Sequence, residues 1–347
     1  MRMRGLGTLR RLAQPYTNLF LPGPIILLYH RVAHVPSDPQ LLCVTPEHFA
    51  EQLEVLRKQG YPIRLQELGC GLRDRKKLPR GVAVTFDDGY EDNLTNAKPL
   101  LERHDVPATV FVTTGYVNQQ RGFWWDELEM LLLHRDPLPK TLRLHIDGMI
   151  HDWDLTLSAD CNRTAHAQHS RWNISESHDP SPRHALYRAL HKLLRPLLED
   201  DQRRVLDRLR VWAGIDELVQ TQYGALSRAQ ILDLAKGGLI EVGCHSVTHP
   251  IFSVLSAPAQ REEVERSKAD LEEIIGLPVT SFAYPFGSKS DYTDDTASEV
   301  ERAGFLCACA NFPAIVTPAS DRYQLPRFLV RDWDGDEFSR RLGAWLS

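Results

Sequence analysis

The sequence has few of the features that mark disulfide-stabilised, membrane-spanning or nucleic-acid-binding proteins. Its six cysteines include no CxxC pair, and four of them lie in or beside apolar runs, so buried free thiols in a reducing compartment explain them best. No run approaches the roughly 18 apolar residues of a membrane span. Lysine plus arginine (41) do not exceed aspartate plus glutamate (46), and the net charge of −5 argues against a nucleic-acid partner.

The first 30 residues are basic but do not have the pattern of a secretory signal. Their apolar stretch is interrupted by Pro22, Gly23 and Pro24, and no small-residue cleavage site follows. We therefore expect a cytoplasmic protein without a transmembrane segment. Four arginines and the apolar residues 19–21 suit this end for peripheral contact with the inner face of a membrane.

Short apolar runs alternate with helical segments along most of the chain. Such runs, each followed by a helix, predict a parallel sheet covered on both faces, and seven of them favour a barrel over an open sheet. The predicted strands are Ile25–Tyr29, Val82–Phe86, Thr109–Thr113, Leu239–Val242, Ser281–Tyr284, Phe305–Ala310 and Arg327–Val330. Helices are predicted from Thr45-Pro46 to about Gly60, from the capping box at Ser227 to Gly237, and over about 258–276, 294–303 and 336–346.

Residues 116–223 break this rhythm. The interval begins with the aromatic segment Phe123-Trp124-Trp125, continues through a polar stretch (158–182) and contains charged helices around 183–213. We interpret it as a mainly helical insertion on one loop of a single barrel that spans residues 1–347.

Polar clusters follow four of the predicted strands, and the carboxyl ends of barrel strands converge on one rim. Each cluster alone has a plain structural explanation: a solvated turn, two unrelated loop histidines, or a histidine at the edge of the core. Together they predict a metal site, because adjacent buried aspartates repel unless a cation lies nearby and histidines four residues apart can share a metal. The clusters are His30-Arg31, Asp87-Asp88-Gly89, His245-Ser-Val-Thr-His249 and Pro285-Phe286-Gly287.

Two of these motifs resemble signatures of one enzyme family. Thr85-Phe-Asp-Asp-Gly-Tyr90 is similar to the first signature of the polysaccharide deacetylase family (carbohydrate esterase 4, NodB homology), and the segment from His245 to His249 matches its second. The resemblance covers most of the chain outside 116–223. It implies a distorted (β/α)7 barrel, with Asp87 as the catalytic base. It also implies that Asp88, His245 and His249 bind a divalent metal, with zinc favoured, although such ligands also suit ferrous iron.

The third signature of the family departs from its usual form in this chain. Ala283 stands where the family has the arginine that orients the catalytic base. That arginine must come from elsewhere or be missing, and Arg327 and Arg31 are the two candidates.

The general acid of the family is a histidine in a C-terminal strand, but no histidine follows His249 here. Ile26-Leu-Leu-Tyr-His30 at the other end of the chain resembles that strand, as in the circularly permuted branch of the family. The resemblance therefore makes His30 the predicted general acid. We expect its strand to lie beside residues 305–310.

The resemblance implies a metal-dependent hydrolase that removes an N-acetyl or other N-acyl group from an amino sugar. The sugar can belong to a glycan or to a lipid-linked or nucleotide-linked precursor. The metal and the backbone N–H of Phe286 would stabilise the oxyanion, and Trp124, Trp125, Trp153 and Trp172 either stack on sugar rings or pack the insertion onto the barrel. The alternatives are a catalytically impaired carbohydrate-binding barrel, favoured by the missing arginine, and a metal-dependent isomerase.

Overall fold

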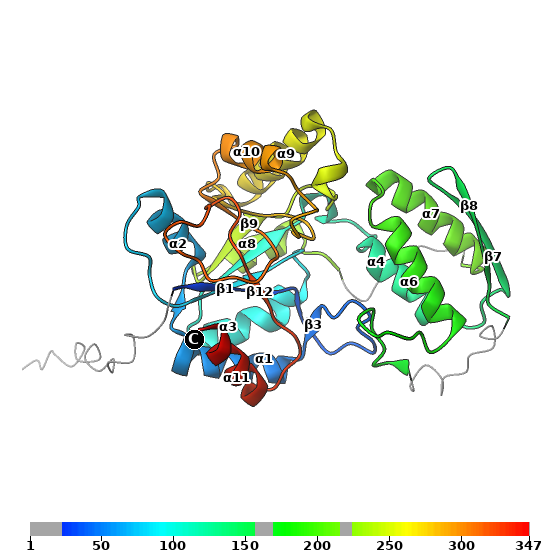
Figure 1. Cartoon of the computed structure of the whole chain (residues 1–347), viewed down its shortest axis with the longest axis horizontal. Helices are drawn as coiled ribbons and strands as arrows, with labels where there is room; N and C mark the ends of the chain where they lie inside the picture. Colours follow the sequence, from blue (N-terminus) through cyan, green and yellow to red (C-terminus); the bar gives the residue numbers. More distant parts are fainter. Residues whose placement is uncertain (1–22, 157–168, 216–223, 347) are drawn as a thin grey trace, which may run out of the picture.

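A parallel sheet forms the centre of the larger body in Figure 1. The structure is a computed structural model that describes residues 23–156, 169–215 and 224–346. The strands of the sheet follow the order β11-β10-β9-β6-β5-β1-β12, and β4 pairs with β5. Their bounds are β1 Ile25–Tyr29, β4 Pro62–Ile63, β5 Val82–Phe86, β6 Ala108–Val112, β9 Ile240–Cys244, β10 Ser281–Ala283, β11 Cys307–Cys309 and β12 Phe328–Leu329.

The segment 322–329 closes this sheet into a distorted barrel. Leu325 forms a parallel bridge with Cys309 of β11, and three residues later Phe328 pairs with Leu27 of β1. The predicted α/β barrel is therefore confirmed. The expectation that residues 25–30 lie beside residues 305–310 is wrong, because segment 322–329 comes between the two strands and β1 pairs with β5 and β12.

Alternate strand residues point into the barrel, where the available space is small. The interior is filled mainly by Phe111 and by the short or branched side chains of Ile26, Ala83, Ala283 and Cys309. Gly243 of β9 faces the Phe111 ring, and a Cβ atom at this glycine would lie 2.5 Å from the ring. The close approach of β9 and β6 at this level therefore requires glycine.

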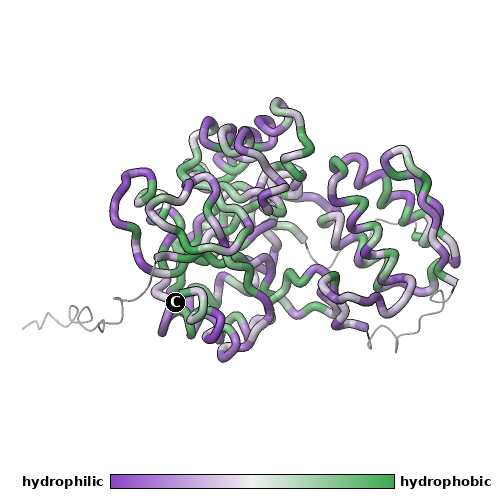
Figure 2. The backbone as a smooth tube through the Cα atoms, in the orientation of Figure 1, coloured by the Kyte–Doolittle hydropathy of each residue, from purple (hydrophilic) through white to green (hydrophobic). Residues whose placement is uncertain are grey.

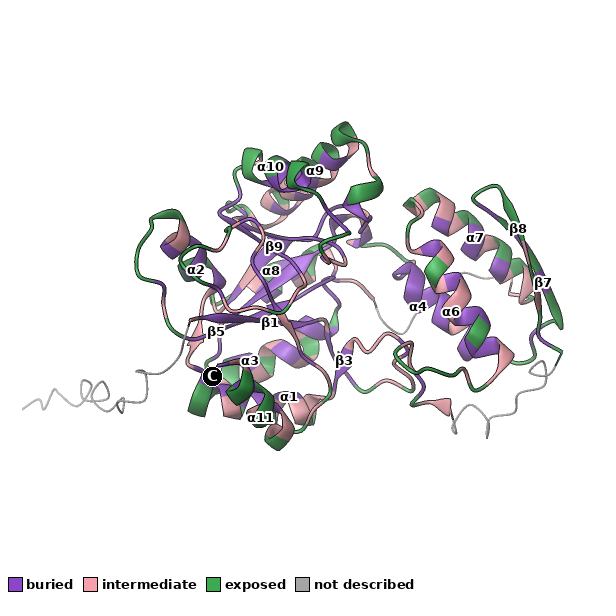
Figure 3. Ribbon diagram, viewed as in Figure 1, coloured by how far each residue is buried: buried purple, intermediate pink, exposed green. Residues whose placement is uncertain are grey.

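Two of the predicted helices around the sheet begin at the capping signals in the sequence, whereas α2 and α3 were not predicted. Thr45 caps α1, with Pro46 in its first turn, and Ser227 and Gln230 form the capping box of α8. Figures 2 and 3 show hydrophobic, buried strands at the centre and hydrophilic, exposed helix faces outside. The bounds are α1 Pro46–Val55, α2 Leu65–Arg73, α3 Lys98–His104, α8 Arg228–Ala235, α9 Ala257–Ile275, α10 Asp294–Arg302 and α11 Gly335–Trp345.

Between β6 and β9 the chain forms a smaller lobe, drawn in green on the right of Figure 1. It consists of α4 Trp124–Leu133, the hairpin of β7 Thr141–Ile146 and β8 Met149–Asp154, α6 Pro182–Leu194 and α7 Glu199–Trp212. This lobe has its own hydrophobic cluster, which includes Leu128, Leu186 and Leu206. The hairpin is a feature that the sequence analysis missed. That residues 116–223 are an insertion in a single barrel stays a prediction, and residues 157–168 and 216–223, with Cys161, lie outside the described residues.

No helix in the described ranges has the length and apolar character to cross a membrane.

Candidate metal centre

The carboxyl end of β5 presents two buried aspartates. The Asp87 N–H donates to the Tyr29 carbonyl of β1 at 2.9 Å, and the Asp88 carbonyl accepts from the Thr113 N–H after β6 at 3.2 Å. Asp88 has a φ of 74°, a left-handed conformation that costs a residue with a side chain about 1–3 kcal/mol and is common at functional sites. Because both carboxylates are buried, they require a nearby positive charge.

The loop after β9 supplies two histidines and is tightly held. The His245 N–H donates to the Val112 carbonyl at 3.0 Å, and the Ser246 hydroxyl accepts from the His249 N–H at 3.0 Å. From α9, the Glu263 carboxylate accepts the two intervening backbone N–H groups at 2.8 and 3.0 Å. Two of these residues, Ser246 and His249, also have positive φ angles of 65° and 59°. The loop therefore holds both imidazoles at the rim of the barrel.

Asp88, His245 and His249 form the one group of three potential metal ligands found among the described residues. The Nε2 atoms of His245 and His249 lie 3.5 and 3.4 Å from the same oxygen, Oδ1 of Asp88. Donor atoms bound to one tetrahedral zinc ion at about 2.0–2.2 Å lie roughly 3.3–3.6 Å apart. The spacing of the three side chains therefore fits a single divalent ion.

The tautomer of His245 also suits a metal ligand. Its Nδ1 lies 2.8 Å from the Ala283 carbonyl oxygen, which can only accept, so Nδ1 carries the proton. The lone pair of Nε2 is then free on the side that faces Asp88. Metal-binding histidines commonly have such a backbone partner on the other ring nitrogen.

The electrostatics of the site favour a cation. Burial opposes ionisation of Asp88, but the adjacent imidazoles of His245 and His249 hold the pKa of its carboxyl well below the usual range. Burial alone would lower the pKa of His245, yet the carboxylates of Asp87 and Asp88 raise it. The negative charges of the two aspartates therefore favour a cation close to the Nε2 atoms of the two histidines.

Arg327 lies behind Asp87 in the barrel interior. Its Nη1 and Nη2 donate to the two oxygens of the Asp87 carboxylate, each at 2.7 Å. The guanidinium is further held by the Ala310 carbonyl (2.8 Å) and the Thr85 hydroxyl (3.2 Å). Although burial opposes ionisation, Arg327 and His245 lower the pKa of Asp87 below its usual value. Arg327 thus pairs with the predicted base, whereas the third motif of this chain has Ala283 at the position of the usual arginine.

Arg31, the other candidate for that position, forms an ion pair with Asp92. Its Nε donates to Oδ2 of Asp92 at 2.9 Å, and its guanidinium lies over the Tyr90 ring, 4.5 Å from the ring centroid. Neither of these two contacts involves the predicted base.

His30 and Phe286 line the same pocket as the three potential ligands. Burial lowers the pKa of His30, and the nearby carboxylates of Asp88 and Asp87 oppose this shift. Phe286 has a φ of 58°, and its ring meets the His249 ring edge-on with centroids 4.7 Å apart. The structure thus brings the predicted base, ligands, acid and oxyanion residue to one pocket, with Arg327 paired to the base.

The pocket has a volume of about 280 Å³, and the sequence analysis missed part of its wall. Helix α6 of the smaller lobe contributes His191, and Arg195 just beyond its end also lines the pocket. The Arg195 guanidinium donates to the Asp291 carboxylate at 2.7 Å and lies 4.2 Å from the centroid of the Phe286 ring. Nothing in the sequence links these residues to the motifs, because they lie in the interval that separates β6 from β9.

Comparison with known proteins gives matches to deacetylases. The family model described as polysaccharide deacetylase matches residues 74–137 and 213–307. The poly-beta-1,6-N-acetyl-D-glucosamine N-deacetylase of Escherichia coli K12 is 32% identical over 88 residues, which are 25% of this chain and 13% of that protein. YxkH of Bacillus subtilis, whose name assigns it to the polysaccharide deacetylases, is 28% identical over 111 residues, 31% of this chain and 38% of the relative. The matches thus span well under half the length of these relatives.

Solved structures of deacetylases share the fold over nearly the whole chain. The Streptococcus pyogenes deacetylase PplD in complex with acetate has a TM-score of 0.56 at 18% identity, covering 94% of this chain and 99% of that chain. IcaB from Ammonifex degensii has a TM-score of 0.56 at 20% identity, covering 94% and 97%. At such identities these likenesses show the fold. The sequence matches, together with the shared fold, support the polysaccharide deacetylase family for this chain.

Proposed function

We propose that this protein is a metal-dependent hydrolase that removes an N-acetyl group, or another N-acyl group, from an amino sugar. The observation that carries the proposal is the set of Asp88, His245 and His249 beside Asp87 in one pocket, with Asp87 held by Arg327. The E. coli relative is a poly-beta-1,6-N-acetyl-D-glucosamine N-deacetylase, and this supports the same reaction here.

We propose that zinc occupies the site, held by Asp88, His245 and His249. Two nitrogen donors and one carboxylate leave room for a water molecule and the substrate, as in hydrolytic zinc sites. When bound, such an ion lowers the pKa of its water toward about 7 and polarises the acyl carbonyl.

The remaining roles fall to protein side chains and one backbone group. Asp87, kept ionised by Arg327, accepts the proton of the attacking water. The backbone N–H of Phe286 donates to the developing oxyanion, a contribution worth roughly 3–4 kcal/mol where it has been measured. His30 protonates the departing amine, because an amide nitrogen leaves poorly as an anion.

The alternative of a catalytically impaired carbohydrate-binding barrel loses its main support. It rested on the alanine at position 283 in place of the arginine that orients the base. Arg327 makes two 2.7 Å hydrogen bonds to Asp87, so the base does have a bidentate arginine partner. No described contact favours the third alternative, a metal-dependent isomerase.

We further propose a cytoplasmic location, with peripheral contact at the inner face of the membrane. Five cysteines lie in the described ranges, and all five are free thiols. Free buried thiols are common in reducing compartments. The residues proposed to contact the membrane precede residue 23 and lie outside the described residues.

Release of free acetate tests the proposed activity. Zinc-loaded protein incubated with a β-1,6-linked N-acetylglucosamine oligomer or a chitooligosaccharide should release acetate. Asp87→Asn should bind the same amount of zinc and be slower by roughly 10²–10⁴-fold, the usual loss when a general base is removed. Equal rates for the variant and the natural protein would contradict the proposal.

A further inference from the structure

Arg331 is a pocket residue that has no carboxylate partner among the described residues. It follows β12 and lines the pocket together with His30 and Leu329. Its guanidinium donates to the Leu41 backbone carbonyl, which is a neutral group. The other charged pairs of the pocket wall are Asp87 with Arg327, Arg195 with Asp291, and Asp88 with the two histidines.

The carboxylate of Asp38 influences Arg331 but is engaged in a different role. Its two oxygens accept the backbone N–H groups of Leu42 and Cys43 at 2.8 and 2.9 Å. Burial lowers the pKa of Arg331, and Asp38 opposes this shift. The guanidinium remains charged at any physiological pH, so the pocket wall carries a partly buried positive charge that no adjacent carboxylate neutralises.

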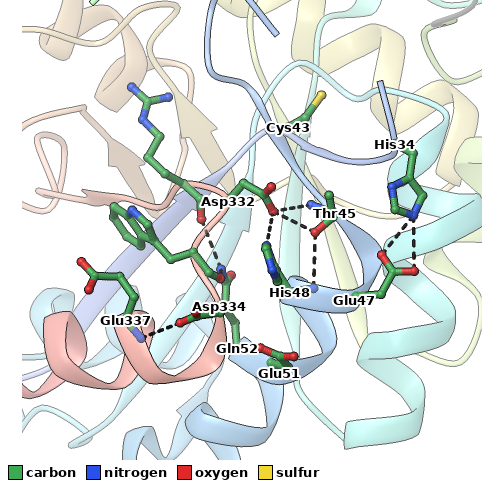
Figure 4. Close-up of polar contacts among 12 residues, drawn as sticks. His34, Cys43, Thr45, Glu47, His48, Glu51, Gln52, Asp332, Asp334 and Glu337 are labelled. Carbon is green, nitrogen blue, oxygen red and sulfur yellow. Dashed lines mark hydrogen bonds and ion pairs between the residues drawn. The ribbon is translucent and has the colours of Figure 1, made fainter. Parts of the chain in front are cut away.

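The backbone around Arg331 is fixed to α1, as Figure 4 shows for its neighbours. The Gln52 side-chain amide donates to the carbonyls of Arg331 and Trp333 at 3.2 and 2.7 Å. The Asp332 carboxylate accepts from the backbone and hydroxyl of Thr45 at 2.8 and 2.9 Å and lies 2.7 Å from Nδ1 of His48. Hydrogen bonds to Gln52 and Thr45 therefore fix the segment 331–333, and the Arg331 side chain extends from this fixed backbone.

We propose that Arg331 forms a subsite for an anionic oxygen group of the substrate, a phosphate or a carboxylate, close to the sugar whose acyl group is removed. The identification of the ligand as a sugar derivative rests on the proposed function. A guanidinium binds both kinds of group through two parallel N–H···O bonds. A neutral poly-N-acetylglucosamine has no such group, so the subsite favours substrates such as phosphate-linked sugar precursors or glycans that contain uronic acids.

A purely structural role for Arg331 would be to hold the turn at Leu41. This contact uses one of the five N–H donors of the guanidinium. The side chain also lines the pocket, where it can present further donors to a ligand. Partial burial of the Arg331 guanidinium without a counter-charge costs free energy. Binding of an anion would offset this cost, whereas the contact with the neutral Leu41 carbonyl does not.

Binding of matched probes tests the subsite. Zinc-loaded Asp87→Asn protein, chosen to prevent turnover, is titrated by calorimetry with N-acetylglucosamine 1-phosphate and with N-acetylglucosamine. A second pair compares glucuronic acid linked to N-acetylglucosamine with glucose linked to N-acetylglucosamine. We expect one of the charged probes to bind about 10- to 100-fold more tightly than its neutral partner, the range of one charge-assisted hydrogen-bonded pair. The pair that shows the preference identifies phosphate or carboxylate as the natural group.

Substitutions at Arg331 assign the preference to this side chain. Arg331→Gln should remove most of the preference, and Arg331→Lys should retain part of it, because lysine keeps the charge but not the planar donor pair. Arg143→Gln removes an equal charge from the exposed face of β7, where Arg143 pairs with Asp152, and should leave the preference unchanged. A circular dichroism spectrum checks the fold of each variant, and if the glutamine variant does not fold, the lysine variant carries the test.

Two results would overturn the subsite. One is equal affinity for the charged and neutral members of both pairs. The other is a preference that survives in folded Arg331 variants. Acetate release by the natural protein is measured separately with the same probes. A charge preference without acetate release would overturn the proposed hydrolase and leave the subsite. Acetate release with equal affinities would overturn the subsite and leave the proposed hydrolase.

Discussion

The Arg327 guanidinium and the Asp87 carboxylate face each other through two hydrogen bonds of 2.7 Å, and both side chains are buried. Burial alone would favour the neutral carboxyl, but the adjacent positive charge lowers its pKa below the usual value. The two parallel bonds also fix the plane of the carboxylate. The pair therefore favours an ionised Asp87 in a defined orientation, which the proposed role of proton acceptor requires.

Arg327→Lys should reduce the turnover number about 10- to 100-fold without loss of the metal. Lysine keeps the charge but contacts one carboxylate oxygen as a point donor. A weaker pair raises the pKa of Asp87. Because the base must be ionised to act, the acidic limb of the pH profile of kcat/KM should move to higher pH. The profile and the zinc content are measured on the same preparations.

Arg31→Lys is a matched control for this substitution. Arg31 is also buried and ion-paired, but its partner is Asp92. The control should leave the acidic limb in place. An unshifted limb in Arg327→Lys, with normal turnover, would contradict the positioning role of Arg327.

His245→Ala should strip the metal while the protein stays folded. The variant removes one of the three donors, and the barrel core around Phe111 and Ile26 does not depend on the ion. Elemental analysis should show near-complete loss of zinc, with an unchanged circular dichroism spectrum. Asp87→Asn is the control and should keep its zinc. Full metal content in His245→Ala would refute the ligand set, and loss of metal in Asp87→Asn but not in Asp88→Asn would exchange the roles of the aspartates.

His30→Ala should lower the turnover number far more than it weakens substrate binding, because the acid acts on the leaving amine in the transition state. A loss of roughly 10²–10⁴-fold is expected for a general acid. The metal content should be unchanged. The basic limb of the pH profile, which reports the protonated acid, should disappear. Steady-state kinetics over a range of pH give both quantities, and a change confined to KM would show that His30 only contacts the substrate.

The parts of the fold that were predicted well are those with a local signal. The bounds of β1 and β5 agree with their apolar runs, and α8 begins at the capping box of Ser227. The neighbour of β1 could not be predicted in this way. Strand order depends on how residues 322–329 pass from Cys309 to Leu27, and the only regular strand in that segment has two residues. A pattern so short carries no information about pairing.

The candidate site shows the same division. Asp87, Asp88, His245 and His249 stand in motifs with fixed spacing, so their convergence could be predicted. Arg195 and Arg331 belong to no motif and reach the pocket through tertiary packing. The left-handed backbone conformation at Asp88 and Phe286 could not be predicted from the sequence either. Neither residue type adopts a positive φ often enough for its presence to indicate one.

Asp126 of α4 should make the protein less stable as the pH rises. Its carboxyl is buried and accepts a hydrogen bond from the Tyr90 hydroxyl at 2.9 Å. Burial raises the pKa of Asp126 to about 8. In the unfolded chain the same carboxyl ionises near pH 4. Between about pH 4 and pH 8 the folded protein therefore holds a proton that the unfolded chain has released, and the free energy of unfolding falls with increasing pH across this window.

Urea denaturation of the natural protein and of Asp126→Asn at pH 5, 6, 7 and 8 measures this effect. Asparagine is close in shape and cannot ionise, so the variant should gain stability relative to the natural protein with each step in pH, by at most roughly 1.4 kcal/mol per unit. Asp147→Asn, in the exposed turn of the β7–β8 hairpin, removes a carboxyl from the same lobe and should give a difference that does not grow. A difference for Asp126→Asn that stays constant from pH 5 to pH 8 would mean that Asp126 is ionised in the folded protein, held by the positive charge of nearby Arg31.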